Sequence, residues 1–427
     1  MKPLPLLLAA ALAVAGVAAR AQAPAGAEQV IGGNVDSLLA FARERHPEFA
    51  AMRHEAEAAA ARVAPAGALP DPMFRAELRD ISNENNPSAS PNLLPALVGS
   101  TRYTISQSLP WAGKRDLRRD IAAADADEAR GRERATWADL ARQIKQVYAQ
   151  HHVHLASIRL RRENLDLLTQ IEQIAQARYA NGLVPQQDVI RAQTERTALQ
   201  SDLAMLEGES DQASARIRAL LGRPANVRIR PPETLRPLPS PAKLEFSALE
   251  ARLRANNPRL VADEARVAAS EKGRELTYKN RYPDFNVGLS PIQTRERITG
   301  WDLMVEVNIP LQQDRRRDEE RAAERMLDAA RSRKEATLNQ ALAEMNEGLA
   351  GLKSARRVEE LVATSLLPQA NLTLQSALAG YETGKVDFAT VLDAQRQIRK
   401  AREDLVRARA DQQVRMAEIE RLIGEDL

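Results

Sequence analysis

Four short segments of the chain alternate apolar and polar residues with a period of two. Their apolar positions are Phe74, Ala76 and Leu78; Tyr103, Ile105 and Leu109; Phe285, Val287 and Leu289; and Leu303, Val305, Val307 and Ile309. This alternation predicts β-strands with one face in an apolar medium and the other in water. The strands alone leave two alternatives open. One is a small sheet resting on helices, and the other is part of a transmembrane barrel with apolar side chains towards lipid and polar ones towards a wet lumen.

The barrel alternative requires several copies of the chain, because four strands cannot close a barrel. Three copies would supply twelve strands, so this alternative predicts a homotrimer. Trp111 and Trp301 lie near the ends of predicted strands, where aromatic residues meet a membrane interface.

Between the strand segments, apolar residues recur at spacings of three and four, which predicts helices. The helix over 114–180 would be about 100 Å long at 1.5 Å per residue. No globular core needs that length, so we expect a coiled-coil rod or one stave of a helical tunnel. The other predicted helices are 36–64, 185–221, 245–279, 314–381 and 387–423.

The chain contains an internal repeat. Residues 179–222 align with 381–424 at a constant offset of 202, with 12 identities in 44 positions. The match extends upstream at offsets of 211 and 200, so the first copy carries extra residues between 80 and 101. That insert, 82–100, is rich in Asn, Ser and Pro and predicts a long polar loop. The identical positions in the first copy are Tyr179, Gly182, Val184, Val189, Ala192, Gln193, Asp202, Leu203, Ala215, Ile217, Leu220 and Gly222.

Each long helix is joined to its return helix by a turn centred on glycine. The turns run from Tyr179 to Pro185 and from Tyr381 to Asp387. Glycine after the last helical turn can adopt the left-handed conformation that ends a helix. Proline fits the first turn of the next helix, and aspartate can cap it. We therefore expect two helical hairpins.

The N-terminus has the pattern of a secretory signal. Lys2 supplies the charge, Leu4 to Ala19 the apolar stretch, and cleavage after Ala21 is favoured. No later stretch reaches the roughly 18 to 20 apolar residues of a spanning helix. The predicted division is a signal peptide over 1–21, a first repeat over 22–222, a Pro-rich linker over 223–244 and a second repeat over 245–427.

Composition narrows the function. Aromatic residues are only 4% of the chain, which suits long helices with narrow apolar seams rather than thick cores. The absence of cysteine excludes disulfides, a thiol nucleophile and a lipid anchor. The net charge of +3, with both signs interleaved, gives no basic face for nucleic acid. We find no phosphate-binding loop, nucleophile elbow or zinc motif, and expect neither an enzyme nor a cofactor.

Together these features resemble the TolC outer-membrane efflux family, over about residues 35–424. The shared features are the signal peptide, the doubled strand-and-helix repeat, the Pro-rich link, and the hairpins followed by Val189-Ile-Arg-Ala-Gln193 and Val391-Leu-Asp-Ala-Gln395. The segments Leu109–Arg115 and Leu69–Pro72 look most like the heavy-metal branch of CusC- and CzcC-like ducts.

The resemblance implies a mainly α fold of TolC type with four transmembrane strands per protomer. It implies a trimer with a twelve-stranded barrel in outer-membrane lipid and a helical tunnel in the periplasm. Its partners would be a periplasmic adaptor and an inner-membrane pump, of RND type. By position, the docking tips would be Gly182, Leu183, Gly384 and Lys385. The implied cargo is heavy-metal cations, with drugs or other small organic compounds as the alternative.

A periplasmic adaptor is the alternative from a different class. Adaptors carry one hairpin within β modules, whereas this chain has two hairpins and four strands. A soluble coiled-coil scaffold would predict neither the strand alternation nor the signal peptide.

Two further groups of residues are candidates for a site. His151 and His154 share a helix face and are weak metal candidates, although no familiar ligand set lies nearby in the sequence. Polar residues near the tips would line a constriction, where a ring of acids from three copies would attract cations. These are Gln173, Gln176, Gln375, Glu382 and Asp387.

Overall fold

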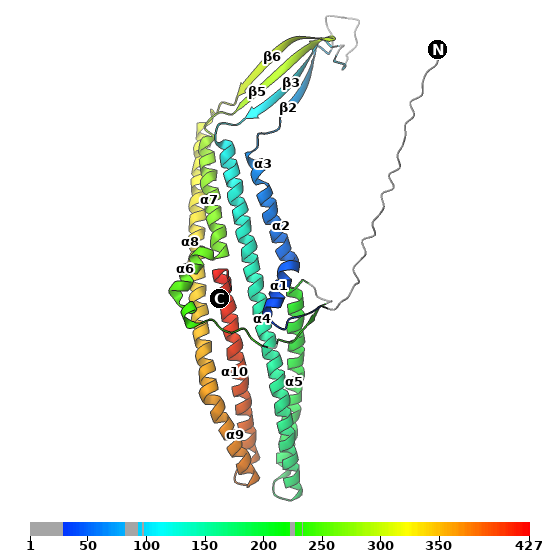
Figure 1. Ribbon diagram of the computed structural model, residues 1–427, viewed down its shortest axis with the longest axis vertical. Coiled ribbons are helices and arrows are strands. Elements are labelled where there is room, and N and C mark those ends of the chain that lie inside the picture. Colours follow the sequence, from blue (N-terminus) through cyan, green and yellow to red (C-terminus); the bar gives the residue numbers. More distant parts are fainter. Residues whose placement is uncertain (1–28, 82–92, 96–97, 223–226, 233) are drawn as a thin grey trace, which may run out of the picture.

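The computed structural model is a long helical rod with a curved sheet at one end and two hairpin tips at the other (Figure 1). It describes residues 29–81, 93–95, 98–222, 227–232 and 234–427. The predicted signal peptide over 1–21 lies outside the described residues, as do most of the insert over 82–100 and the start of the Pro-rich linker.

The element order repeats. The first repeat contains α1 (Val35–Arg45), α2 (Pro47–Ala61), α3 (Val63–Gly67), β2 (Met73–Arg79), β3 (Ser100–Leu109), α4 (Lys114–Ala180) and α5 (Gln186–Leu220). The second contains α6 (Phe246–Asn256), α7 (Pro258–Lys279), β5 (Phe285–Thr294), β6 (Arg297–Val307), α8 (Gln313–Leu361), a π-helical turn (Val362–Leu366), α9 (Leu367–Glu382) and α10 (Phe388–Ile423). Outside them, β1 (Gln29–Ile31) pairs in parallel with β4 (Val227–Ile229), and a 3₁₀ turn covers Pro241–Leu244.

The first helix of each repeat differs from the expected continuous segment. Proline lacks an amide hydrogen and disfavours helix in the residue before it, so the chain breaks before Pro47 and Pro258. The residue before each proline caps the new helix. Asn257 accepts hydrogen bonds from the amides of Arg259 and Leu260, both at 3.0 Å. The second long helix is also interrupted, by the π-helical turn.

Each return helix ends on a left-handed glycine that abuts the first helices of its own repeat. Gly222 and Gly424 have φ of +70° and +72°. A side chain on Gly222 would meet the ring of Pro47, and one on Gly424 would meet Pro258 and the carbonyl of Asn256. As a result α2 continues the rod where α5 ends, and α7 continues it where α10 ends.

The strands form one antiparallel sheet in the order β2-β3-β5-β6, with both hairpins joined through β3 and β5. Phe74, Ile105, Leu289 and Leu303 face one another across the four strands. In the part of the chain that the structure describes, no helix is both long and apolar enough to cross a membrane.

The linker crosses the rod at mid-height and is tied to it by a buried ion cluster (Figure 1). Glu420 of α10 is 4% exposed. It accepts hydrogen bonds from Lys145 of α4 at 2.6 Å and from Arg236 of the linker at 3.0 Å. This cluster joins the first repeat, the linker and the second repeat at one point.

Candidate functional site

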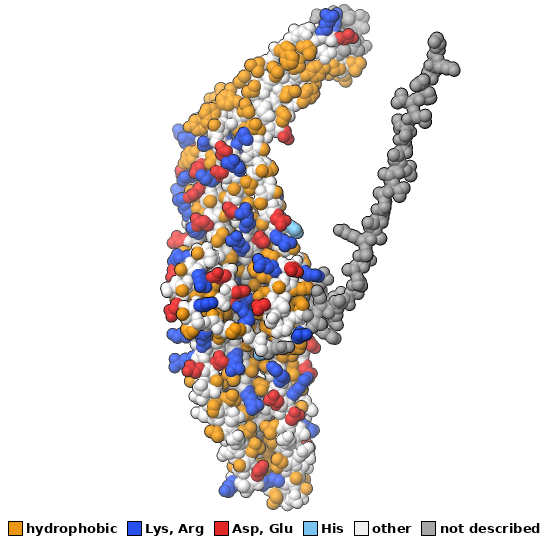
Figure 2. Space-filling model, in the orientation of Figure 1, with side chains coloured by type: hydrophobic (Ala, Val, Ile, Leu, Met, Phe, Trp, Pro, Cys, Tyr) orange, Lys and Arg blue, Asp and Glu red, His pale blue; other side chains and the backbone are white. Residues whose placement is uncertain are grey.

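One face of the sheet is apolar and exposed. Phe74, Ile105, Leu289 and Leu303 form a row at one level and are 67%, 60%, 50% and 72% exposed. On the face that Figure 2 shows, apolar side chains gather over the strand end except at its outermost tip, whereas charges of both signs are mixed over the helices. A contiguous exposed apolar surface of this kind marks contact with a membrane or a partner.

The opposite face of the sheet is polar. Arg102 forms an ion pair with Asp302 at 2.7 Å, and the hydroxyls of Thr104 and Ser290 lie 2.8 Å apart. These residues alternate along the strands with the apolar row. The sheet therefore separates an apolar side from a polar side, as the alternation in the sequence predicts.

Aromatic residues lie at two levels of the apolar face. Trp111, just after β3, stacks on Tyr282 and Phe285 with ring centroids 5.1 and 5.9 Å apart. Trp301 is 63% exposed and lies within β6, four residues in, rather than at a strand end. Phe285 pairs with Val307, six residues beyond Trp301, so the two levels are about 20 Å apart along the strand.

At the other end of the rod, both hairpin tips are exposed and turn on a left-handed glycine. Gly182 and Gly384 have φ of +71° and +72°, as the sequence predicts. Leu183 is 66% exposed, and Lys385 is also exposed. The four tip residues thus lie at the free ends of the two hairpins (Figure 1).

The two tips are joined by Arg178, which the sequence analysis did not single out. Its guanidinium lies over the ring of Tyr381, 4.8 Å from the centroid. It also donates hydrogen bonds to the carbonyls of Tyr381 and Glu382. Tyr381 is 3% exposed and packs edge-on against Phe388. The recurrence of tyrosine at 179 and 381 was a signal for this contact, but it does not reveal which residue of the other hairpin reaches it.

Carboxylates lie beside this contact. Burial raises the pKa of Asp188, and the charge of Asp387 raises it further, against the opposing effect of Arg191 and Arg178. Hydrogen bonds from the hydroxyl and amide of Thr390 lower the pKa of Asp387. Asp387 therefore caps α10, as its position in the sequence predicts.

The other candidate constriction residues are spread along the hairpins. Glu382 ends α9 and is exposed, while Gln375 lies about two turns further up the same helix, also exposed. Gln173 and Gln176 are exposed on α4. The role of these side chains as a constriction stays a prediction.

The histidines lie between α4 and α5. His151 is 3% exposed and lies 3.2 Å from the hydroxyl of Ser214. Burial, then the neighbouring His154 and His152, lower the pKa of His151 to about 4. His154 pairs with Glu209 at 3.2 Å. Among the described residues, no three metal-binding side chains gather into a group suited to an ion.

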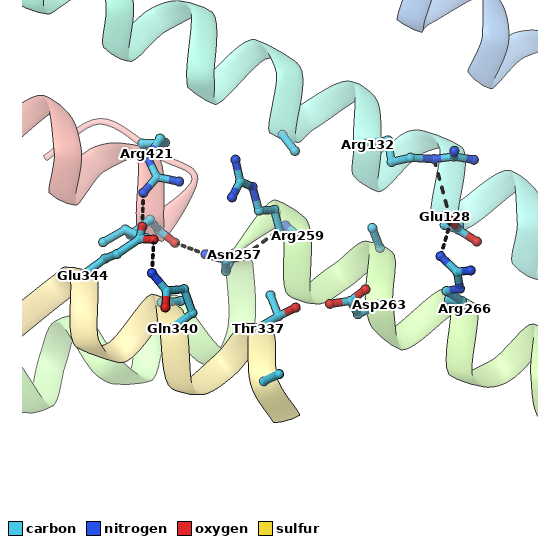
Figure 3. Close-up of a pocket in the computed structure, with 15 residues that line it drawn as sticks. Glu128, Arg132, Asn257, Arg259, Asp263, Arg266, Thr337, Gln340, Glu344 and Arg421 are labelled. Carbon is cyan, nitrogen blue, oxygen red and sulfur yellow. Dashed lines mark hydrogen bonds and ion pairs between the residues drawn. The ribbon is translucent and has the colours of Figure 1, made fainter. Parts of the chain in front are cut away.

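A polar cavity of about 560 Å³ lies between α4, α7, α8 and α10 (Figure 3). Glu344 of α8 accepts a hydrogen bond from Arg421 of α10, and Glu128 of α4 lies 4.0 Å from Arg266 of α7. Arg259 reaches Asp139 of α4 at 2.9 Å. Because these charges pair with one another across the helices, the cavity is part of the seam between the repeats.

The comparisons with known proteins agree with this architecture. The family described as "Outer membrane efflux protein" matches residues 38–223 and again 249–425, which confirms the internal repeat. The cobalt-zinc-cadmium resistance protein CzcC of Cupriavidus metallidurans is 22% identical over 371 residues, covering 86% of this chain and 84% of that protein.

Solved structures show the same fold. A structure of CusC superposes with a TM-score of 0.79 at 18% identity, covering 93% of each chain. The outer membrane protein VceC of Vibrio cholerae superposes with a TM-score of 0.76 at 17% identity, covering 92% of this chain and 96% of that one. These likenesses confirm the predicted TolC-like fold, mainly helical with a four-stranded sheet.

An exposed apolar strand face, a rod of paired long helices and a doubled family match thus agree: the chain belongs to the outer membrane efflux protein family, as an outer-membrane efflux channel with its helical tunnel in the periplasm.

Proposed function

We propose that this protein is the exit duct of a tripartite efflux system, working as a homotrimer whose twelve strands close one barrel. The observation that carries the proposal is the apolar row across all four strands, backed by the polar face with the Arg102–Asp302 pair. A sheet of four strands with unpaired edges in lipid is unfavourable, because lipid cannot satisfy backbone hydrogen bonds. Closure with two further copies removes both edges.

Trp111 and Trp301 are the proposed membrane-interface aromatics. The separation of about 20 Å between their levels is close to the apolar band of about 25 Å in outer-membrane barrels. The polar face of the sheet then lines the lumen.

The tips are the proposed docking surface for a periplasmic adaptor and, behind it, an inner-membrane pump of RND type. Gly182, Leu183, Gly384 and Lys385 are exposed at the ends of the hairpins. Three protomers would present six such tips as a ring. Arg178 holds the two tips of one protomer together, and with Asp188 and Asp387 it forms the proposed seal of the periplasmic end.

Heavy-metal cations are the proposed cargo. The likeness to CzcC, a cobalt-zinc-cadmium resistance protein, supports this choice, as do the tip carboxylates Asp188, Glu382 and Asp387, which would attract cations. Drugs or other small organic compounds are the alternative. The proposed division of the chain is a signal peptide over 1–21, a first repeat over 22–222, a Pro-rich linker over 223–244 and a second repeat over 245–427.

The test is a deletion strain complemented with the wild-type gene and challenged with a metal and drug panel. The proposal expects sensitivity to cobalt, zinc, cadmium, copper or silver that the wild-type gene reverses. Unchanged metal tolerance with increased drug sensitivity would favour the alternative cargo. No change with either would contradict an export role.

A further inference from the structure

A polar cavity of about 550 Å³ lies where the strands of the second repeat meet the rod. It is bounded by the end of α7, the start of β5, the end of β6 and the start of α8, with one side chain from α4. Three cations line it, Lys114, Arg315 and Arg316, together with two carboxylates, Asp284 and Glu319. The lining therefore carries one positive charge more than negative charges.

Two of the three cations are neutralised inside the cavity. Lys114 forms an ion pair with Asp284 at 2.8 Å. Arg315 forms another with Glu319, one turn further along α8, at 2.9 Å. Among the residues that the structure describes, Arg316 is the cation of this cavity that has no carboxylate partner. The excess positive charge of the cavity is therefore that of Arg316.

Arg316 is also placed against the local field. It lies in the first turn of α8, where the positive end of the helix dipole disfavours a cation. No side chain caps this end of the helix. The guanidinium donates a hydrogen bond to the carbonyl of Asn280, but its Nε is buried and has no hydrogen-bond partner. A phosphate in the cavity would remove these costs together, because its oxygens fit the donors of a guanidinium and it is attracted to a helix N-terminus.

The surroundings of the cavity are apolar and aromatic. Tyr282 lines it, is 51% exposed, and stacks on Trp111 at the lower aromatic level of the sheet. Ile309 and Leu311 flank Pro310, another lining residue, and are 66% and 80% exposed. On the face that Figure 2 shows, Lys and Arg side chains lie directly below the apolar strand end. Aromatic side chains of this kind lie at the level of lipid headgroups, so the cavity suits a ligand with both a phosphate and hydrocarbon chains.

From this arrangement we infer that the cavity binds the phosphate of a phospholipid from the periplasmic leaflet of the outer membrane, with Arg316 as its main contact. A phosphodiester carries one negative charge, which matches the one unpaired cation. The acyl chains then lie over Ile309 and Leu311, which continue the apolar face of the sheet. The inference rests on the proposed function, since it requires that this face lies in lipid.

The site belongs to the second repeat alone. The repeat offset of 200 places Asp116 of α4 at the position of Arg316. The side chain of Asp116 is exposed, and its carboxylate would repel a phosphate. Each protomer therefore has one such site, and a trimer has three.

The test is native mass spectrometry of the full-length protein, purified in detergent and freed of lipid. The trimer is titrated with dimyristoyl phosphatidylglycerol. Dimyristoylglycerol, which has the same chains without the phosphate, and inorganic phosphate are titrated in parallel. The inference predicts three tightly bound phosphatidylglycerol molecules per trimer, no comparable binding of dimyristoylglycerol, and no displacement of the lipid by an equal concentration of inorganic phosphate.

Arg316→Ala should weaken phosphatidylglycerol binding about tenfold or more, because it removes a hydrogen-bonding charge from the site. Arg317→Ala is the matched control. It removes the same charge from the next residue, which pairs with Asp314 and does not line the cavity, and it should leave the affinity unchanged. Equal weakening by both variants would show general attraction to a basic surface and overturn the site, as would unchanged binding in Arg316→Ala. Displacement of the lipid by an equal concentration of inorganic phosphate would make this a site for a free anion and overturn the lipid assignment.

Leu311→Ser tests the part of the site that contacts the acyl chains. It should weaken the binding of phosphatidylglycerol, whereas Leu183→Ser, at an equally exposed leucine of the tip, should not. Equal binding in both variants would overturn the assigned position of the chains. The same spectra report the mass of the complex, so trimers that bind no lipid at this site would overturn the inference alone. A protein without trimers would refute the proposed function and the inference with it.

Discussion

Replacing Leu303 by arginine tests which face of the sheet meets lipid. Leu303 is 72% exposed and belongs to the row of Phe74, Ile105 and Leu289 that spans all four strands. It lies two residues from Trp301 and four from Val307, well inside the apolar band. The substitution therefore places a guanidinium within the hydrocarbon layer.

The expected cost follows from that depth. An arginine near the midplane of an outer-membrane barrel costs about 2–4 kcal/mol on the lipid-facing side. Since each 1.4 kcal/mol is a factor of ten, the ratio of folded to unfolded protein should fall roughly 30- to 700-fold. Met304 is the next residue along β6 and points to the polar face. Met304→Arg is therefore the matched control, and it should stay near wild-type stability.

The assay is urea unfolding of the protein in phospholipid vesicles, followed by gel mobility. A lower unfolding midpoint for Leu303→Arg alone supports the assignment of the two faces. Equal destabilisation by both variants, or a larger effect of Met304→Arg, would refute the conclusion that the apolar row faces lipid.

Three more predictions concern the rod. Arg178→Ala should raise single-channel conductance in planar bilayers, because it removes a contact of the proposed seal. Arg162→Ala removes only an exposed ion pair with Glu207 and should not raise it. Equal conductance in the wild type and in both variants would refute the seal. Gly182→Pro should abolish export but preserve the trimer, because proline cannot adopt φ of +71° and removes the amide that bonds to the Tyr179 carbonyl; normal export would remove the docking role of this tip. Burial lowers the pKa of His151 from 6.5 in the unfolded chain to about 4 in the folded chain. The free energy of unfolding should therefore fall by roughly 3 kcal/mol per protomer as the pH drops from 6.5 to 4. In thermal melts from about pH 7 to about pH 4, the melting temperature of His151→Gln should fall less than that of the wild type. An equal fall in both proteins would contradict this role of His151.

The features that the sequence predicts well are those with a local period. Strand alternation at 74–78, 103–109, 285–289 and 303–309 gives both the strands and the face that each side chain occupies, because successive side chains in a strand point to opposite sides. The constant offset of 202 places both hairpins and their glycines correctly.

The features that the sequence misses depend on contacts between distant segments or on single prolines. The helices predicted over 36–64 and 245–279 run through Pro47 and Pro258, whereas the chain breaks before each of these prolines, because proline cannot donate the interior hydrogen bond of a helix. Pro368 likewise interrupts the helix expected over 314–381. Arg178 could not be singled out, because its contact with Tyr381 depends on how two hairpins about 200 residues apart pack together.

The mass of the native complex tests the central claim most directly. Outer membranes would be extracted with a mild detergent, and the purified complex measured by native mass spectrometry. A duct whose four strands per chain share one barrel must appear as three copies of the chain in the outer-membrane fraction. A single copy recovered from the soluble periplasmic fraction would contradict the account.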